Sequence, residues 1–126
     1  MNVNMEVGLT HKSQLVVSDS DTAISRGSGD MPVLATPAMM ALMENAAMLA
    51  VSACLPEGCT TVGGHIESSH LSPTPIGSQV EAIAILEKVE GRKLTFRVEA
   101  WQGDKLIGEG SHLRFIVERQ KFLSKL

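Results

Sequence analysis

Three side chains with the chemistry of acid–base or nucleophilic catalysis lie at informative positions in the sequence, namely Thr36, Glu44 and His70. Glu44 lies inside a long apolar stretch, where a carboxylate is costly unless it has a partner, is protonated or faces a cavity. The imidazole of His70 can act as a general base near neutral pH. The hydroxyl of Thr36 could cap a helix or point into a pocket at the helix start, where backbone amides favour anions.

Each of the three residues also has a structural interpretation. Glu44 and Asn45 together could mark a narrow exposed stripe of a helix. A lone histidine such as His70 usually has a structural role, and Thr36 could be a helix cap and nothing more. Residue type alone therefore leaves these alternatives open.

Two adjacent glycines, Gly63 and Gly64, interrupt a segment that otherwise has the pattern of a strand. Glycine weakens strands and often marks a bulge or the close approach of a ligand. The pair could leave room for a ligand or present a backbone amide to it. It is not a phosphate-binding loop, because no lysine follows and no helix begins there.

The remaining histidines and the cysteines give no evidence for a metal site. His65 precedes His70 by five residues, so the two side chains would lie on opposite faces of a regular strand. We assign no role to His112. Cys54 and Cys59 are the only cysteines, which excludes a four-cysteine zinc site within one chain, and nothing in their use demands an oxidising compartment.

The element that must position Glu44 is a helix predicted over residues 35–55, which are rich in Ala, Met and Leu. Thr36 has the N-cap position, Pro37 the first helical position, and Pro56 ends the helix. Because the stretch is apolar all round, we expect the helix to be buried. The stretch has about the minimum length that spans a bilayer, but it is mostly Ala and Met and has Glu44 and Asn45 near its middle, which argues against a membrane span.

Strand patterns surround this helix. Residues 5–17 predict a first strand, and residues 18–30 a loop with room for one short strand. The strands expected after the helix cover residues 61–71, 80–86, 93–100 and 106–117. Short turns between the last strands favour antiparallel pairing. One long central helix wrapped by a curved antiparallel sheet of about five strands is an α+β arrangement, and the hotdog fold is the obvious candidate.

A single sheet of this kind leaves an unpaired edge, which edge pairing with a second copy would cover. We therefore expect a homodimer, with a tetramer left open. The 126 residues suit one domain spanning 1–126. Residues 119–125 contain Lys and Arg and are expected to be a solvated end.

The composition excludes several classes of function. A net charge of −3 and only four Phe and Trp residues argue against nucleic-acid binding, which favours a basic surface or an aromatic stacking platform. The N-terminal residues lack a basic region followed by an apolar run, so no signal peptide is expected. These features predict a cytoplasmic protein without a membrane segment.

From residue 35 onward the chain resembles the fluoroacetyl-CoA thioesterase group of hotdog thioesterases. The resemblance is in the stretches MMALMENAAMLA, HIESSHLSPTPIG and KVEGRKLTFRVEAWQGDKLIGEGSHLRFIV. In that family the catalytic group is a Thr, a Glu eight residues later and a His twenty-six residues further on. Thr36, Glu44 and His70 match these types and spacings.

The resemblance implies further site residues. The glycine near the family's substrate carbonyl corresponds to Gly63, with Gly64 beside it, and an arginine lining the family's pocket corresponds to Arg114. The family's aromatic lid has no counterpart in residues 28–34, which contain no aromatic residue. Selectivity for a fluorinated acyl group is therefore not implied.

The expected function is hydrolysis of a small or medium acyl-CoA thioester to free acid and coenzyme A. Coenzyme A is then part of the substrate, and no retained cofactor or metal is expected. Arg92, Lys93 and Arg114 are candidates to contact its phosphates. The alternatives are a non-catalytic acyl-CoA binder or sensor on the same fold and, ranked last, an enoyl-thioester hydratase.

In the expected mechanism, His70 is the general base, and Glu44 attacks the carbonyl or holds the attacking water. Thr36 would orient the Glu44 carboxylate or the thioester through its hydroxyl. Eight residues of unbroken helix span about 12 Å, so Thr36 and Glu44 cannot bond directly. They could flank the substrate at different depths, the helix could be interrupted, or the groups could meet across a dimer interface.

Overall fold

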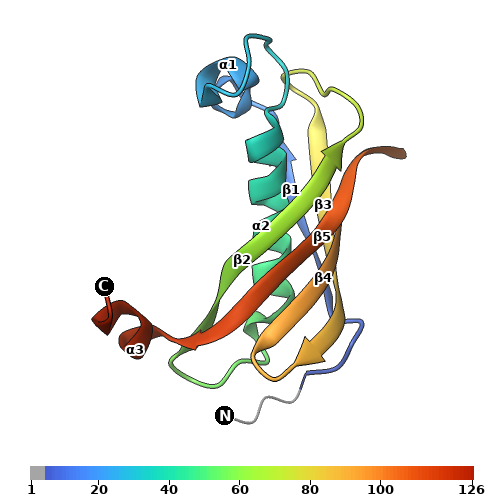
Figure 1. Cartoon of the computed structure of the whole chain (residues 1–126). Helices are drawn as coiled ribbons and strands as arrows, with labels where there is room; N and C mark the ends of the chain where they lie inside the picture. The colour runs from blue at the N-terminus through green and yellow to red at the C-terminus, as the bar shows by residue number, and fades with distance from the viewer. Residues whose placement is uncertain (1–4) are drawn as a thin grey trace.

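The computed structural model describes residues 5–126, which form five strands and one long helix with short helical segments around them (Figure 1). The strands are β1 (Thr10–Val16), β2 (Cys59–His70), β3 (Gln79–Glu90), β4 (Lys93–Gln102) and β5 (Lys105–Glu118). The helices are α1 (Ala23–Arg26), α2 (Thr36–Ser52) and α3 (Arg119–Ser124), with a 3-10 turn at Asp19–Asp21.

All neighbouring strands pair antiparallel in the order β1-β3-β4-β5-β2, so β1 and β2 form the two edges of the sheet. The sheet curves around α2, which lies along its inner face (Figure 1). This is the α+β arrangement of one helix and five antiparallel strands that the sequence predicts.

Alternation of buried and half-exposed residues builds the core. On β3 and β4 every second side chain faces α2 and is fully buried, as period-two strands require. Several of these side chains are small, so the helix can approach the sheet closely. The fully buried residues on β3 and β4 are Val80, Ala82, Ala84, Leu86, Leu94, Phe96, Val98 and Ala100.

The helix is not buried all round in a single chain, contrary to the sequence-based expectation. Its inner face is buried through residues such as Met39 and Met43. Its opposite face leaves Ala41, Asn45 and Leu49 exposed, and Leu49 retains 39% of its surface. The expectation was wrong because an apolar sequence pattern does not show which face of a helix the rest of the chain covers.

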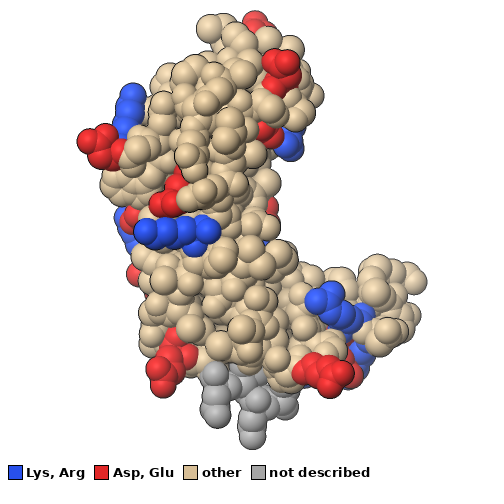
Figure 2. All heavy atoms as spheres, turned by 180° about the vertical axis from the view of Figure 1, so that it is seen from behind, with Lys and Arg blue, Asp and Glu red and all other residues tan. Residues whose placement is uncertain are grey.

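The edge strand β2 lies beside this open helix face. Its exposed residues gather in residues 63–69, and its pairing with β5 shifts register between Gly63 and His65, as expected for a glycine bulge. Seen from behind, the molecule is hollowed between its upper end and α3, which projects from the body (Figure 2). The charged residues on that face are scattered.

Other segments differ from expectation. The first strand starts at Thr10 rather than at residue 5, and the following segment, expected as a loop with room for one short strand, contains a 3-10 turn and α1. The C-terminal end is exposed, as expected, and its residues form the short helix α3. No helix in the described part of the chain is long and apolar enough to cross a membrane.

Candidate active site

The hydroxyl of Thr36 and the ring of His70 form the closest polar pair of the site. Oγ1 of Thr36 lies 2.7 Å from Nδ1 of His70. The sequence predicted Thr36 as the helix N-cap, and this was wrong. Ala35 has that position, and no side chain caps the helix. Thr36 is the first residue of α2 and Pro37 the second, so the hydroxyl is available to the histidine at the end of β2.

A cavity of about 310 Å³ adjoins this pair and is lined by both of its residues. Its other walls come from α1, from residues 28–34 and from residues 71–73, which follow β2. Burial lowers the pKa of His70 below its ordinary value of 6.5, so the ring is neutral at neutral pH. Nε2 of His70 is buried and has no hydrogen-bond partner within residues 5–126.

Glu44 lies further along α2, half-buried, with its carboxylate above Gly63 of β2. A Cβ added to Gly63 would lie only 3.0 Å from Oε2 of Glu44. The same Cβ would lie 3.3 Å from the His112 ring and 3.5 Å from Nη1 of Arg114. Gly63 therefore lies where the Glu44 carboxylate, the His112 imidazole and the Arg114 guanidinium come together, and a larger residue would crowd all three.

Arg114 is only 6% exposed, and hydrogen bonds hold it in this cluster. Its Nε donates to the hydroxyl of Thr61 at 2.8 Å, and its Nη2 donates to the carbonyl oxygen of Thr61 at 2.9 Å. Burial lowers the pKa of Arg114, while the charge of Glu44 opposes that change. Arginine remains charged in proteins, so the site contains a fixed cation facing a carboxylate.

Glu44 forms no ion pair within 4.0 Å in the described chain. The carboxylate and the guanidinium therefore lie on two sides of the space above Gly63 without closing it. A side chain at position 63 would crowd both groups, since its Cβ alone would lie 3.0 Å from Oε2 of Glu44 and 3.5 Å from Nη1 of Arg114.

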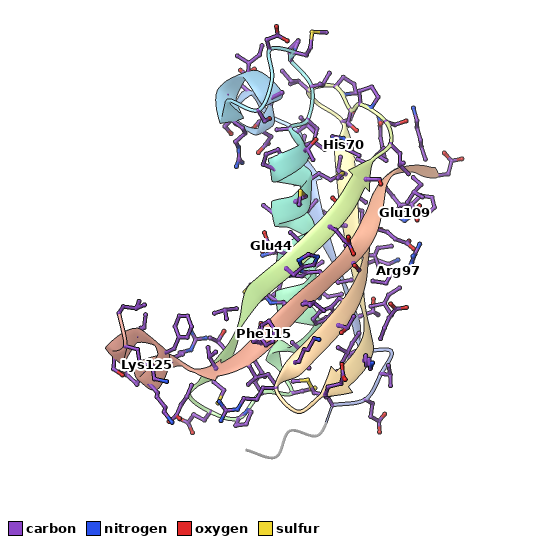
Figure 3. All side chains as sticks on the ribbon, viewed as in Figure 1. Glu44, His70, Arg97, Glu109, Phe115 and Lys125 are labelled. Atoms are coloured by element: carbon purple, nitrogen blue, oxygen red, sulfur yellow. The ribbon has the colours of Figure 1, made fainter. Side chains whose placement is uncertain are left out.

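Within one chain, His70 at the end of β2 lies apart from Glu44 in the middle of α2 (Figure 3). Helix α2 is continuous from Thr36 to Ser52, which excludes an interruption between its two site residues. On β2, Gly63 and His70 are seven residues apart, about 23 Å in an extended strand. A single chain thus brings Thr36 to His70 and Glu44 to Arg114, but does not bring the two pairs together.

The other expected contacts lie elsewhere. A Cβ at Gly64 would collide with the ring of Phe115, so Gly64 packs against the opposite face of the sheet from Glu44. Arg114 is too deeply buried to reach a phosphate outside the protein. Arg92 lines a surface hollow that also includes Lys121 and Lys125 from the C-terminal end.

Sequence reasoning missed two residues of the cluster, His112 and Thr61. Both are buried, His112 at 1% and Thr61 at 4% exposure. The available signal was the alternation of His112, Arg114 and Ile116 on one face of the last strand, because polar residues at buried positions need partners.

A larger hollow, of about 490 Å³, lies on the outer face of the sheet and contains Arg97. This guanidinium already bonds to Glu99 at 2.9 Å and to Glu109 at 3.5 Å. Its charge is therefore satisfied, and neither Thr36 nor Glu44 lines the hollow. Within residues 5–126 no group of three or more His, Cys, Asp or Glu side chains is arranged to hold a metal ion.

The buried histidines predict a pH-dependent stability. Burial lowers the pKa of both His70 and His112, so each gains its proton less readily in the folded chain than in the unfolded one. The free energy of unfolding should be highest above pH 6.5 and should fall as the pH drops toward the pKa values of the two histidines in the folded chain. Urea unfolding at several pH values, with NMR titration of the ring protons, measures both quantities. Ring pKa values above 6.5 would contradict the described burial.

The chain is similar to known proteins over most of its length. The family model described as fluoroacetyl-CoA-specific thioesterase matches residues 17–120. The fluoroacetyl-CoA thioesterase of Streptantibioticus cattleyicolor is 39% identical over 94 residues, which cover 75% of this chain and 68% of that protein.

Solved structures are similar as well. A mutant of the fluoroacetyl-CoA enzyme in complex with acetyl-CoA matches with a TM-score of 0.90, 33% identity and 96% of each chain covered. A thioesterase superfamily member from Thermus thermophilus matches with a TM-score of 0.90, 30% identity, 97% of this chain and 90% of that one. These matches confirm the hotdog fold and the expected class of enzyme, a thioester hydrolase. The chain therefore belongs to the fluoroacetyl-CoA-specific thioesterase family.

Proposed function

We propose that the protein hydrolyses short acyl-CoA thioesters to free acid and coenzyme A, at a site built by two copies of the chain. The observation that supports this most is the 2.7 Å contact between Thr36 and His70 beside a cavity of about 310 Å³. A hydroxyl within hydrogen-bond reach of a neutral imidazole is an activated nucleophile. Acetyl-CoA, which is bound to the mutant relative, is the first substrate to test.

The two-chain site follows from the free edge of β2. Its exposed residues lie in 63–69, centred on Ile66, and an exposed strand edge favours pairing with another strand. Antiparallel pairing of two copies about Ile66 would set Gly63 opposite the partner's Ser69. Glu44 of one chain would then lie beside Thr36 and His70 of the other. The apolar outer face of α2 would be covered in the same homodimer.

The chemistry has two steps. Oγ1 of Thr36 attacks the thioester carbonyl while its proton passes to Nδ1 of His70, which then protonates the departing thiolate of coenzyme A. Water held by the partner's Glu44 then attacks the acyl-threonine ester. Glu44 accepts a proton from that water, the acid leaves, and Thr36 regains its proton.

The start of α2 can stabilise the oxyanion that forms in both steps. Thr36 is the first residue of a seventeen-residue helix, and no side chain caps its free amide groups. Unpaired amides and the positive end of the helix dipole favour a developing negative charge there. Arg114 adds a fixed positive charge at the Glu44 side of the site.

The phosphates of coenzyme A need cations outside the cavity. Arg92, Lys121 and Lys125 line one hollow together with Glu118, and none of the three cations forms an ion pair within 4.0 Å in the described residues. The hollow lies near the Cys59 end of β2, because Cys59 pairs with Glu118 directly before α3. In the antiparallel dimer that end adjoins the partner's His70. We assign these three cations to the phosphates of the substrate in the partner's cavity.

Thiol release from acyl-CoA substrates tests the proposed reaction. Wild-type protein should release coenzyme A from acetyl-CoA, and Glu44→Gln or His70→Asn should lower turnover at least about a hundredfold. Glu44→Gln should still form acyl-Thr36, seen by mass spectrometry as one added acetyl group per chain. Glu87→Gln and His11→Asn, both at exposed positions, are the matched controls. Tight binding without thiol release from any acyl-CoA would instead favour a binder or sensor.

The space above Gly63 predicts the effect of one methyl group. Gly63→Ala would press a Cβ against the Glu44 carboxylate and displace it, so kcat should fall at least about tenfold. Thermal unfolding checks that the variant remains folded. Unchanged kcat in the folded variant would show that Glu44 does not act from its described position.

The phosphate assignment predicts a change in KM alone. Arg92→Gln combined with Lys121→Gln should raise KM for acetyl-CoA about tenfold, because two charge-assisted contacts are lost. Hydrolysis of acetyl-pantetheine, which lacks the nucleotide, should not change. Lys12→Gln on β1, at the other edge of the sheet, is the control. An equal loss with both substrates would contradict the assignment.

A further inference from the structure

His112 is a buried titratable residue without a part in the reaction proposed above. It lies on β5, two residues before Arg114, and is 1% exposed. Its Nδ1 lies 2.7 Å from the backbone carbonyl oxygen of His65, and its Nε2 lies 3.2 Å from Nη1 of Arg114. Both ring nitrogens therefore have a partner inside the cluster.

These two partners determine the tautomer of the ring. A carbonyl oxygen can only accept, so Nδ1 of His112 must be the nitrogen with the proton. A guanidinium can only donate, so Nε2 must offer a lone pair to Arg114. His112 is thus a neutral imidazole protonated at Nδ1, and the backbone of β2 fixes this state.

The bond from Arg114 to His112 completes the support of the guanidinium. Thr61 accepts from Nε and Nη2, which holds one side of the group. His112 accepts a hydrogen bond from Nη1, the nitrogen of the planar group that lies nearest to Gly63. With this bond, the plane of the guanidinium is held on three of its nitrogens.

We infer that His112 is a positioning residue, which through Nε2 holds Arg114 at the space above Gly63 that faces Glu44. This inference rests on the proposed thioesterase function, because the held cation acts on the water or acyl group between it and the carboxylate. The ring itself does not touch the reacting atoms.

The charges around His112 favour this role. Burial lowers the pKa of the ring, and the adjacent Arg114 charge lowers it further. Glu44 from α2 and the carbonyl oxygen of His65 from β2 act in the opposite direction, while the His65 side chain has a smaller lowering effect. The neutral acceptor therefore persists at neutral pH.

Two isosteric variants separate the functions of the ring nitrogens. Asn at position 112 can keep the donor to His65 but has no acceptor near Nε2, whereas Gln can present an acceptor oxygen to Arg114. His112→Asn should lower kcat about ten- to hundredfold with KM for acetyl-CoA near the wild-type value. His112→Gln should recover most of that loss, and His11→Asn on β1 is the matched control.

A second experiment tests whether His112→Asn lowers kcat only by destabilising the fold. In an Arg114→Lys background, His112→Asn should cause little further loss of kcat, because the group that it positions is already gone. Equal losses in the Asn and Gln variants, or full additivity with Arg114→Lys, would overturn the inference.

NMR separates failure of this inference from failure of the proposed function. The ring ¹⁵N spectrum, with His112 assigned by loss of its signals in His112→Asn, should show a protonated Nδ1 and an unprotonated Nε2 at neutral pH. A ring protonated at Nε2 would overturn the positioning role whatever the activity. Conversely, the expected tautomer in a protein that releases no thiol would reject the thioesterase assignment and leave the Arg114 contact intact.

Discussion

The free edge of β2 is the constraint on which the proposed site depends. Within one chain, α2 brings Thr36 to His70 at one end of this strand and Glu44 to Gly63 near its middle. No bending of the continuous helix can join the two groups. Pairing of two β2 edges would satisfy the exposed backbone and, in the same step, supply each half-site with its complement. The same pairing of β2 edges would then form both the dimer and the complete active site.

A buried ionic cluster explains how the chain tolerates polar groups in an otherwise apolar interior. Removing a charge from water is costly, and a carboxylate near a guanidinium offsets that cost only if hydrogen bonds satisfy both groups. Thr61 and His112 satisfy Arg114, whereas Glu44 is left without a direct ion pair. Glu44, the member without a direct ion pair, is the one that the reaction would use. Gly63 keeps the space beside it open.

Three of the site residues could be recognised in the sequence from their residue type and their neighbours. A Glu in an apolar helix, a His before a proline-rich turn and a Thr before a proline were recognisable, and the resemblance fixed their spacing. The α+β fold followed from the alternation of β3 and β4. The role of His112 could not be found in this way, because a strand pattern does not reveal which residue of another strand lies opposite. The contact of Gly64 with Phe115 likewise depends on register across the β2 bulge.

A mixed dimer tests the central claim most directly. Chains with Glu44→Gln and chains with His70→Asn, co-expressed with different affinity tags, give a purified dimer that has one copy of each. A shared site predicts that one of its two sites is fully intact, so its turnover should be about half that of the wild-type dimer, far above either parent. A mixed dimer no more active than the two parents would contradict the account, because each site would then lie within one chain.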